Sequence, residues 1–514
     1  MVRSTAVVSS ATMLSRVFGF VRDMVIAYLF GAGMGADAFF VAFRVPNLLR
    51  RLFGEGALSA AFIPVFSETL TDRGEEDAFR LSSATFNVTA LVLIFLCLLA
   101  EVYTPFIVRC IAPGFTDTAA KYSLTVSLTR ITIPYLLFIS MVAVSMGVLN
   151  SLGHFAAPAL APVLLNISLI TSALTLYHVF DHPATALAVG VLAGGISQFL
   201  FQLPFLIKKG VRYFFTFSHP ALKQITTLMI PGILGLAVAE INILVDTLLA
   251  SLLPQGSVSY LYYGNRVVQL PLGVFATALG TVILPMLSKQ AAAEEEEKLK
   301  ETFSLALRLV FFISIPAMAA LLVLSRPVVT LLFQHGRFDS FIAIQTATAL
   351  SFYAVGLFAY SGVKVMVPVF YAFKDTKTPV KIAVFCLILN IGLNLLLMGP
   401  LKHGGLALAT ALSSIVNLAL LGIVLNRRLT GIAWNDIMKS LGRVLAGAGL
   451  LAGMCRFLLI YFRFYSQSKT GQALTMLAIV GSGITVYWVI TSWMGSEETR
   501  YLKRSFKTRG CLEE

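Results

Sequence analysis

The chain has 514 residues, of which 57% are hydrophobic and 12% are charged, and its mean hydropathy is +0.84. Soluble domains average about 25% charged residues, so this composition excludes a soluble globular enzyme and indicates a polytopic membrane protein. The net charge of +14 does not indicate nucleic-acid binding, because the basic residues lie between apolar runs, as the loop charges of membrane proteins do.

Apolar runs of about 20 residues predict membrane-spanning helices, and they follow one another along the whole chain. The predicted fold is therefore all-α, with about fourteen transmembrane helices. The runs cover residues 8–30, 38–66, 84–108, 124–149, 157–178, 184–206, 225–251, 257–287, 304–324, 341–371, 380–398, 404–425, 438–462 and 472–494. Loops rich in lysine and arginine alternate with poorer loops, and the positive-inside rule places the richer set, with both termini, in the cytoplasm.

The first six predicted spans resemble the next six. Pro64 matches Pro285 at a shift of 221, and Gly114 matches Gly336 at a shift of 222. Because six is an even number, both copies have the same orientation in the membrane, an arrangement of transporters whose site lies between the halves. The predicted domains are an N-lobe, a C-lobe, and a C-terminal helix pair with a basic tail, at residues 1–210, 211–430 and 431–514.

Charged residues are concentrated in the first two spans, where each charge costs at least ~2.5 kcal/mol and is therefore usually functional. Helical spacing puts Arg16 and Asp23 on one face of the first span, and Asp37 and Arg51 on one face of the second. Arginines outnumber carboxylates here, and guanidinium groups bind phosphate bidentately. We therefore predict a cationic cavity for an anion. Its candidate residues are Arg16, Arg22, Asp23, Asp37, Arg50, Arg51 and Arg266.

Two structural explanations compete with an anion site. Arg50 and Arg51 could form salt bridges with Asp37 or Glu55. The other is that Arg22 and Asp23 reach the membrane interface by snorkelling.

A second polar set has the ligand types of a monovalent cation site. Asn390 and Asn394 are four residues apart on one predicted span, and Asp246 and Thr410 could reach the same space. One carboxylate with amide and hydroxyl oxygens suits a hard cation such as sodium, whereas the alternative is polar contact between helices. The five cysteines show no metal or disulfide pattern. No catalytic or ATP-binding motif is found, so a transporter is predicted rather than an enzyme.

Several motifs resemble those of the MurJ/MviN lipid II flippases. The most specific lie in the first two spans, at residues 15–23 (SRVFGFVRD), 30–33 (FGAG), 37–43 (DAFFVAF) and 46–51 (PNLLRR). Further matches are residues 112–115 (APGF), 262–266 (YYGNR) and 377–381 (KTPVK).

This resemblance implies membership of the multidrug/oligosaccharidyl-lipid/polysaccharide exporter superfamily, with two six-helix lobes in parallel repeat and a C-terminal helix pair beside a groove for a lipid tail. It implies outward movement of lipid II, the undecaprenyl-pyrophosphate-linked peptidoglycan precursor, across the bacterial cytoplasmic (inner) membrane. Membrane lipids and the cell-wall synthesis machinery are the further partners expected. The family's cavity arginines fall on Arg16, Arg22, Arg50 and Arg266, and a functional acid falls on Asp37. The sodium ligands of some members fall on Asp246, Asn390, Asn394 and Thr410, although their pattern has a carboxylate where this chain has Asn394.

Three other functions are weighed against a flippase. A drug/cation antiporter of the same superfamily would need exposed carboxylates in the first-lobe cavity, where arginines dominate. A membrane enzyme acting on polyprenyl phosphates would need a paired-acid or histidine motif, and none is found. The third alternative is a non-transporting scaffold for cell-wall synthesis.

Overall fold

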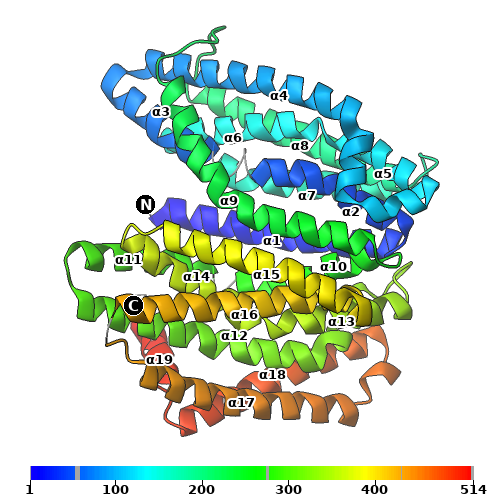
Figure 1. The fold of residues 1–514 in the computed structure, drawn as a ribbon, viewed down its shortest axis with the longest axis vertical. Coiled ribbons are helices and arrows are strands. Elements are labelled where there is room, and N and C mark those ends of the chain that lie inside the picture. Colours follow the sequence, from blue (N-terminus) through cyan, green and yellow to red (C-terminus); the bar gives the residue numbers. More distant parts are fainter. Residues whose placement is uncertain (1, 52–57, 274–276, 430, 511–514) are drawn as a thin grey trace. The chain divides into compact units, whose positions relative to one another are not determined.

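The computed structural model describes residues 2–51, 58–273, 277–429 and 431–510, and in these ranges it contains helices and no β-strand (Figure 1). The predicted all-α fold is therefore confirmed. Packing divides the helices into two compact units. Unit 1 comprises Met1–Ser259 and His335–Phe338, and unit 2 comprises Tyr260–Gln334 and Asp339–Glu514. The predicted lobe boundary after residue 210 follows the sequence repeat and stays a prediction.

Unit 1 contains nine long helices, a 3-10 helix and the start of a tenth helix in its described part. They are α1 (Val2–Phe30), α2 (Met34–Leu49), α3 (Ser59–Arg73), α4 (Glu75–Ile111), η2 (Pro113–Asp117), α5 (Ala119–Thr132), α6 (Tyr135–Ser151), α7 (Ala156–Thr175), α8 (Ala184–Lys208), α9 (Leu222–Ser251) and α10 (Ser257–Pro271). Helix α10 begins in unit 1 and continues into unit 2.

Unit 2 contains the remaining helices. They are α11 (Thr277–Ala292), α12 (Glu296–Phe333), α13 (Ser340–Val355), α14 (Leu357–Ala372), α15 (Lys377–Leu401), α16 (His403–Arg428), α17 (Trp434–Tyr461), η4 (Phe464–Ser466), α18 (Lys469–Trp493) and α19 (Glu497–Gly510).

Among the described residues, nine helical segments are long and apolar enough to cross a membrane, or ten if α13 and α14, which meet at a bend of 42°, are one span. Helix α4 shows the expected lipid face, because Leu91, Phe95, Leu98 and Val102 follow helical spacing and are all exposed. The chain is thus a multi-pass membrane protein. The predicted number of fourteen spans stays a prediction, because charges shorten the apolar stretch of helices such as α1.

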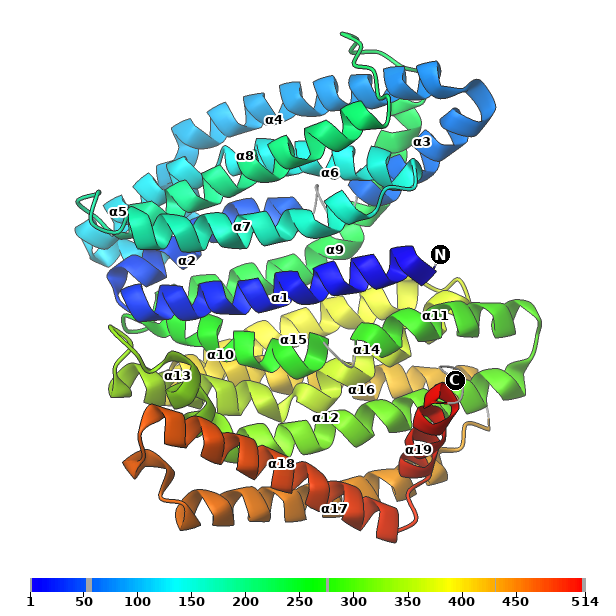
Figure 2. The same ribbon diagram turned by 180° about the vertical axis from the view of Figure 1, so that it is seen from behind.

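Small residues let the helices of unit 1 pack closely. Gly190 and Gly194 lie one turn apart on α8, and a Cβ at either position would lie 3.1 Å from the Cα atom of Leu169 or Leu165 on α7. Figures 1 and 2 show these two helices side by side. Close approach through small residues is the usual way in which membrane helices gain van der Waals contact without a hydrophobic driving force.

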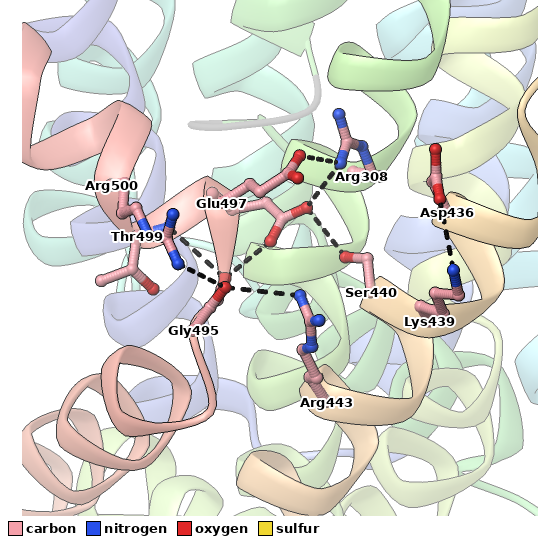
Figure 3. A network of polar contacts seen from close by, with 11 residues as sticks. Arg308, Asp436, Lys439, Ser440, Arg443, Gly495, Glu497, Thr499 and Arg500 are labelled. Carbon is pink, nitrogen blue, oxygen red and sulfur yellow. Dashed lines mark hydrogen bonds and ion pairs between the residues drawn. The ribbon is translucent and has the colours of Figure 1, made fainter.

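Within unit 2, a polar network connects helix α19 to helices α12 and α17 (Figure 3). Glu498 is buried, and it accepts hydrogen bonds from Ser440 Oγ on α17 at 2.9 Å and from Ser496 Oγ at 2.6 Å. Beside it, Arg308 Nη1 on α12 lies 2.6 Å from Glu497 Oε2. This hydrogen bond and the charge of Arg308 lower the pKa of Glu497. The network fixes the C-terminal helix to two helices that are distant in sequence.

Candidate functional site

Asp37 lies in the first turn of α2, and its carboxylate is 1% exposed. It accepts hydrogen bonds from Lys121 Nζ and Gly256 N, both at 2.8 Å, and from the amide and hydroxyl of Ser259 at 3.1 and 2.7 Å. Lys121 Nζ also lies 3.8 Å from the ring centroid of Phe115. The two backbone amides belong to the start of α10, so the carboxylate caps this helix and interacts with the positive end of its dipole. We refer to Asp37, Lys121, Gly256 and Ser259 as the α10 clamp.

Two glycines that the repeat matches lie in equivalent surroundings within unit 1. A Cβ at Gly114 would collide with the carbonyl group of Ser251 at the end of α9, and a Cβ at Gly336 would collide with the carbonyl oxygen of Tyr28 near the end of α1. The amide of Arg337 also donates a hydrogen bond of 2.9 Å to that oxygen of Tyr28. Each glycine therefore lies against the first helix of the other copy, which is physical support for the repeat.

Arg22 and Asp23 form a buried pair that also involves α7. Arg22 donates from Nε and Nη2 to Asp23 Oδ1 at 3.0 and 2.7 Å, and from Nη1 to Asn166 Oδ1 at 3.0 Å. Asn166 in turn donates to the carbonyl oxygen of Ser15 at 3.2 Å. Because Asp23 is fully buried, this geometry describes an internal pair rather than snorkelling. The sequence reading did not consider Asn166, a single amide within an apolar stretch of α7.

Arg16 differs from Arg22 in that its side chain is exposed. It forms no hydrogen bond or ion pair with another residue that the structure describes. Helical spacing places it on α1 two turns before Asp23. In this state Arg16 is therefore available to an external anion, whereas the guanidinium of Arg22 is already held.

The arginines after α2 contact amide and carboxylate oxygens. Arg50 donates from Nε and Nη2 to Asn47 Oδ1 at 3.2 and 2.9 Å. Arg51 Nη1 lies 3.1 Å from Glu240 Oε1 on α9, and the Glu240 side chain is 10% exposed. Arg51 thus forms a salt bridge, although with Glu240 and not with Asp37, which pairs with Lys121. Glu55, one of the partners considered, lies outside the described residues.

The remaining candidate residues are divided between the units. Asp246 belongs to α9 and unit 1, whereas Arg266 lies half-buried on the part of α10 in unit 2. Asn394 and Asn390, both buried on α15, are joined by a hydrogen bond of 2.8 Å from Asn394 Nδ2 to Asn390 Oδ1. Thr410 Oγ1 donates to a backbone carbonyl of its own helix at 3.0 Å. The structure therefore brings the two asparagines together, and the sodium site stays a prediction.

The matched motif at residues 377–381 begins α15 beside a capping aspartate. Asp375 accepts hydrogen bonds from the amide and hydroxyl of Thr378 at 3.0 and 2.8 Å, and Arg428 Nη1 lies 2.8 Å from its Oδ2 atom. The hydrogen bond from the Thr378 amide, more than the charge of Arg428, lowers the pKa of Asp375. This segment connects the loop before α15 to the end of α16.

Comparison with known proteins identifies the family. The family model described as lipid II flippase MurJ matches residues 26–479. A protein of Vibrio cholerae named "Probable lipid II flippase MurJ" is 38% identical over 96% of both chains. One of Burkholderia cenocepacia named "Lipid II flippase MurJ" is 33% identical and covers 98% of this chain and 99% of its own.

Solved structures agree with this assignment. "Lipid II flippase MurJ, inward closed conformation" has a TM-score of 0.80 at 28% identity and covers 95% of this chain and 98% of its own. An inward-facing multidrug resistance MATE family transporter of the MOP superfamily shares the fold, with a TM-score of 0.69 at 15% identity over 83% of this chain and 98% of its own. The chain therefore belongs to the MurJ family of lipid II flippases.

Proposed function

We propose that the protein flips lipid II from the inner to the outer leaflet of the bacterial cytoplasmic membrane by alternating access. The observation that carries this proposal is membership of the MurJ family over nearly the whole chain. The arginines that the resemblance assigns to the cavity are all present, which supports an anionic head group as the substrate. The protein acts as a transporter and not as an enzyme, because moving a lipid between leaflets changes no covalent bond.

The head group is held by charge. Arg16, exposed and without a described partner, makes the first contact with the diphosphate, and Arg22 adds a guanidinium held in place by Asp23 and Asn166. Arg50, Arg51 and Arg266 complete the anion-binding set, with Asp23 and Asp37 as its acidic members. In a cavity of low dielectric constant, such contacts are much stronger than in water. A membrane potential that is negative inside assists export by ~2.3 kcal/mol for each negative charge and each 100 mV.

The lipid tail stays in the membrane beside the last two spans. Helix α17 exposes Leu450 and Phe457, and helix α18 exposes Leu477 and Ile484. These apolar surfaces suit a polyprenyl chain as well as membrane lipids. The charged head group and the apolar tail therefore remain in environments that match them during transport.

The α10 clamp is the element that we expect to change during transport. It holds the start of α10 in unit 1, and the same helix carries Arg266 in unit 2. A change of state that moves α10 has to release up to four hydrogen bonds to Asp37. This coupling gives Asp37 a second role in transport, in addition to its place in the anion-binding set.

The proposal also covers the orientation of the protein in the membrane, its coupling ion and its protein partners. The basic loops place both termini in the cytoplasm. Sodium is proposed as a coupling or structural ion, held by Asp246, Asn390, Asn394 and Thr410. Components of the cell-wall synthesis machinery are proposed as partners, since they supply and consume the precursor.

Depleting the protein from cells and locating the lipid-linked precursor separates the alternatives. A flippase predicts that lipid II accumulates in the inner leaflet while its total amount stays constant or rises. A biosynthetic enzyme predicts that an earlier intermediate accumulates, and a scaffold predicts normal leaflet distribution with impaired polymerisation. A drug/cation antiporter predicts no change in lipid II but greater sensitivity to cationic compounds.

A further inference from the structure

A basic pocket lies in unit 2 where α17 ends and α18 begins. It is an open hollow of about 550 Å³ that is formed by α12, the last turns of α17 and the turn around η4. Three of its lining residues are arginines, Arg326, Arg456 and Arg463, and no lining residue is acidic. None of them belongs to the anion-binding set proposed above, so this pocket calls for a separate explanation.

The three arginines have no counter-charge in the described part of the chain. All three are exposed and none forms an ion pair there. Among the described residues, the guanidinium groups contact one aromatic ring, since that of Arg326 lies 4.8 Å from the ring centroid of Tyr465. Like charges that converge on one pocket repel one another, and their repulsion is relieved by a bound anion. The pocket therefore has the electrostatics of an anion site.

The turn that presents Arg463 is held in place by packing and hydrogen bonds. Arg463 has φ 48° and ψ 51°, a left-handed conformation that is uncommon for residues other than glycine and persists where its surroundings enforce it. The next residue, Phe464, is 1% exposed and packs in the core of unit 2. Gln467 donates to the carbonyl oxygen of Phe462 at 2.7 Å and accepts a bond of 2.8 Å from Thr475 Oγ1. The backbone that carries Arg463 is thus fixed before a ligand arrives.

The surroundings of the pocket indicate that its anion belongs to a lipid. Phe457, Ile460 and Tyr461, next to Arg456 on α17, are between 61% and 68% exposed, as residues that face lipid are. Arg326 lies seven residues before the end of α12, which is about 10 Å along the helix axis. Basic and aromatic side chains at this depth meet lipid head groups, and guanidinium groups bind phosphate oxygens bidentately.

We propose that Arg326, Arg456 and Arg463 form a binding site for the phosphate group of a lipid head group. The predicted orientation places this site at the periplasmic face of the membrane. It does not depend on flipping activity, because any phosphate-bearing lipid of that leaflet offers the same chemistry. Phospholipids and polyprenyl diphosphates are both sources of such a group, and a free phosphate anion is a third.

Lipid binding to the purified full-length protein, measured by native mass spectrometry, tests the site. The probes are phosphatidylglycerol and a polyprenyl diphosphate, and inorganic pyrophosphate is tested separately by thermal shift. The variant is Arg326→Gln/Arg456→Gln. The matched control is Arg109→Gln/Lys402→Gln, which removes two exposed positive charges outside the pocket from loops predicted to lie on the same membrane face.

The site predicts about tenfold weaker binding of at least one lipid probe in the pocket variant and less than a twofold change in the control, and the probe affected identifies the lipid. Equal loss in both variants, or loss in neither, would overturn it. Stabilisation of only the wild type by pyrophosphate, with lipid binding unchanged, would assign the pocket to a free anion and overturn the lipid site. If the double variant does not fold, Arg463→Asn takes its place in the same comparison, because asparagine tolerates the left-handed conformation.

Discussion

The carboxylate of Asp37 accepts two hydrogen bonds from Ser259, the residue that follows it by 222 positions. The same shift relates Gly114 to Gly336, and a shift of 221 relates Pro64 to Pro285, so Asp37 contacts a residue within one position of its own equivalent in the second copy. The repeat thus explains why α2 and α10 begin at nearly equivalent positions. It does not by itself reveal that these positions touch, since a sequence match carries no information about contact.

Replacing Asp37 by asparagine is expected to destabilise the protein. The buried ammonium group of Lys121 would lose its counter-charge, and breaking a buried pair in this way costs about 3–5 kcal/mol. Thermal unfolding in detergent measures the loss. The double variant Asp37→Asn/Lys121→Met should recover part of it, since it removes the uncompensated charge. An unchanged unfolding temperature in Asp37→Asn would show that the clamp is not a stabilising contact.

Gly336→Ala is expected to lower the unfolding free energy by more than the cost of a left-handed backbone alone. Gly336 has φ +57°, and a Cβ there would collide with the backbone of Tyr28. Gly153→Ala is the matched control, because Gly153 has φ +72° but open space around it. The control should lose about 1–2 kcal/mol of unfolding free energy, and Gly336→Ala should lose clearly more. Equal losses, measured by denaturant unfolding, would contradict the close approach.

Asp375 is expected to make stability depend on acid pH. Its pKa is lowered in the folded state by the hydrogen bond from the Thr378 amide and by Arg428. Its stabilising contribution is therefore fully present above the unfolded pKa of about 3.9 and is lost as the pH falls through the lower folded value. Asp375→Asn should unfold at a lower temperature than the wild type at pH 7. When the unfolding temperature is measured as a function of pH, the values of the two proteins should converge below pH 4. A constant difference across this range would exclude the linkage.

Asn166→Ala is expected to weaken transport by releasing one side of Arg22. The substitution removes the acceptor of Arg22 Nη1, while the contact with Asp23 remains. Flipping should fall, but by less than in Arg22→Ala, which removes the guanidinium itself and its contacts with Asp23. Ser197→Ala on α8 is the control, because Ser197 is half-buried and its hydroxyl donates to a carbonyl oxygen of its own helix. Flipping at the wild-type rate in Asn166→Ala would show that Arg22 needs no support from α7.

The sequence predicted the helices well because burial in lipid requires long apolar runs, and in the described residues each predicted span lies on one helix or on two consecutive helices. The breaks were less predictable. The span at 124–149 is interrupted beside Pro134, which has no amide hydrogen to continue a helix. The α13–α14 bend at Gly356 has no comparable signal.

The site was predicted less completely, because its contacts join residues that are distant in sequence. Lys121 falls between the predicted spans at 84–108 and 124–149, yet it is buried against Asp37, 84 residues away. Likewise, Glu240 lies 189 residues from Arg51. A charge pattern identifies costly residues, but only the tertiary structure shows which of them neutralise one another.

The central claim is tested most directly by reconstituting the protein in liposomes and measuring the movement of fluorescent lipid II between leaflets. Wild type and the control Arg109→Ala should flip the lipid well above the rate of empty liposomes. Arg16→Ala should flip lipid II at least about tenfold more slowly than wild type. Its unfolding temperature should be unchanged, since Arg16 forms no hydrogen bond or ion pair with a described residue that the substitution would remove. Flipping by Arg16→Ala at the wild-type rate would contradict the anion-binding account, and wild-type liposomes indistinguishable from empty ones would contradict the proposed function itself.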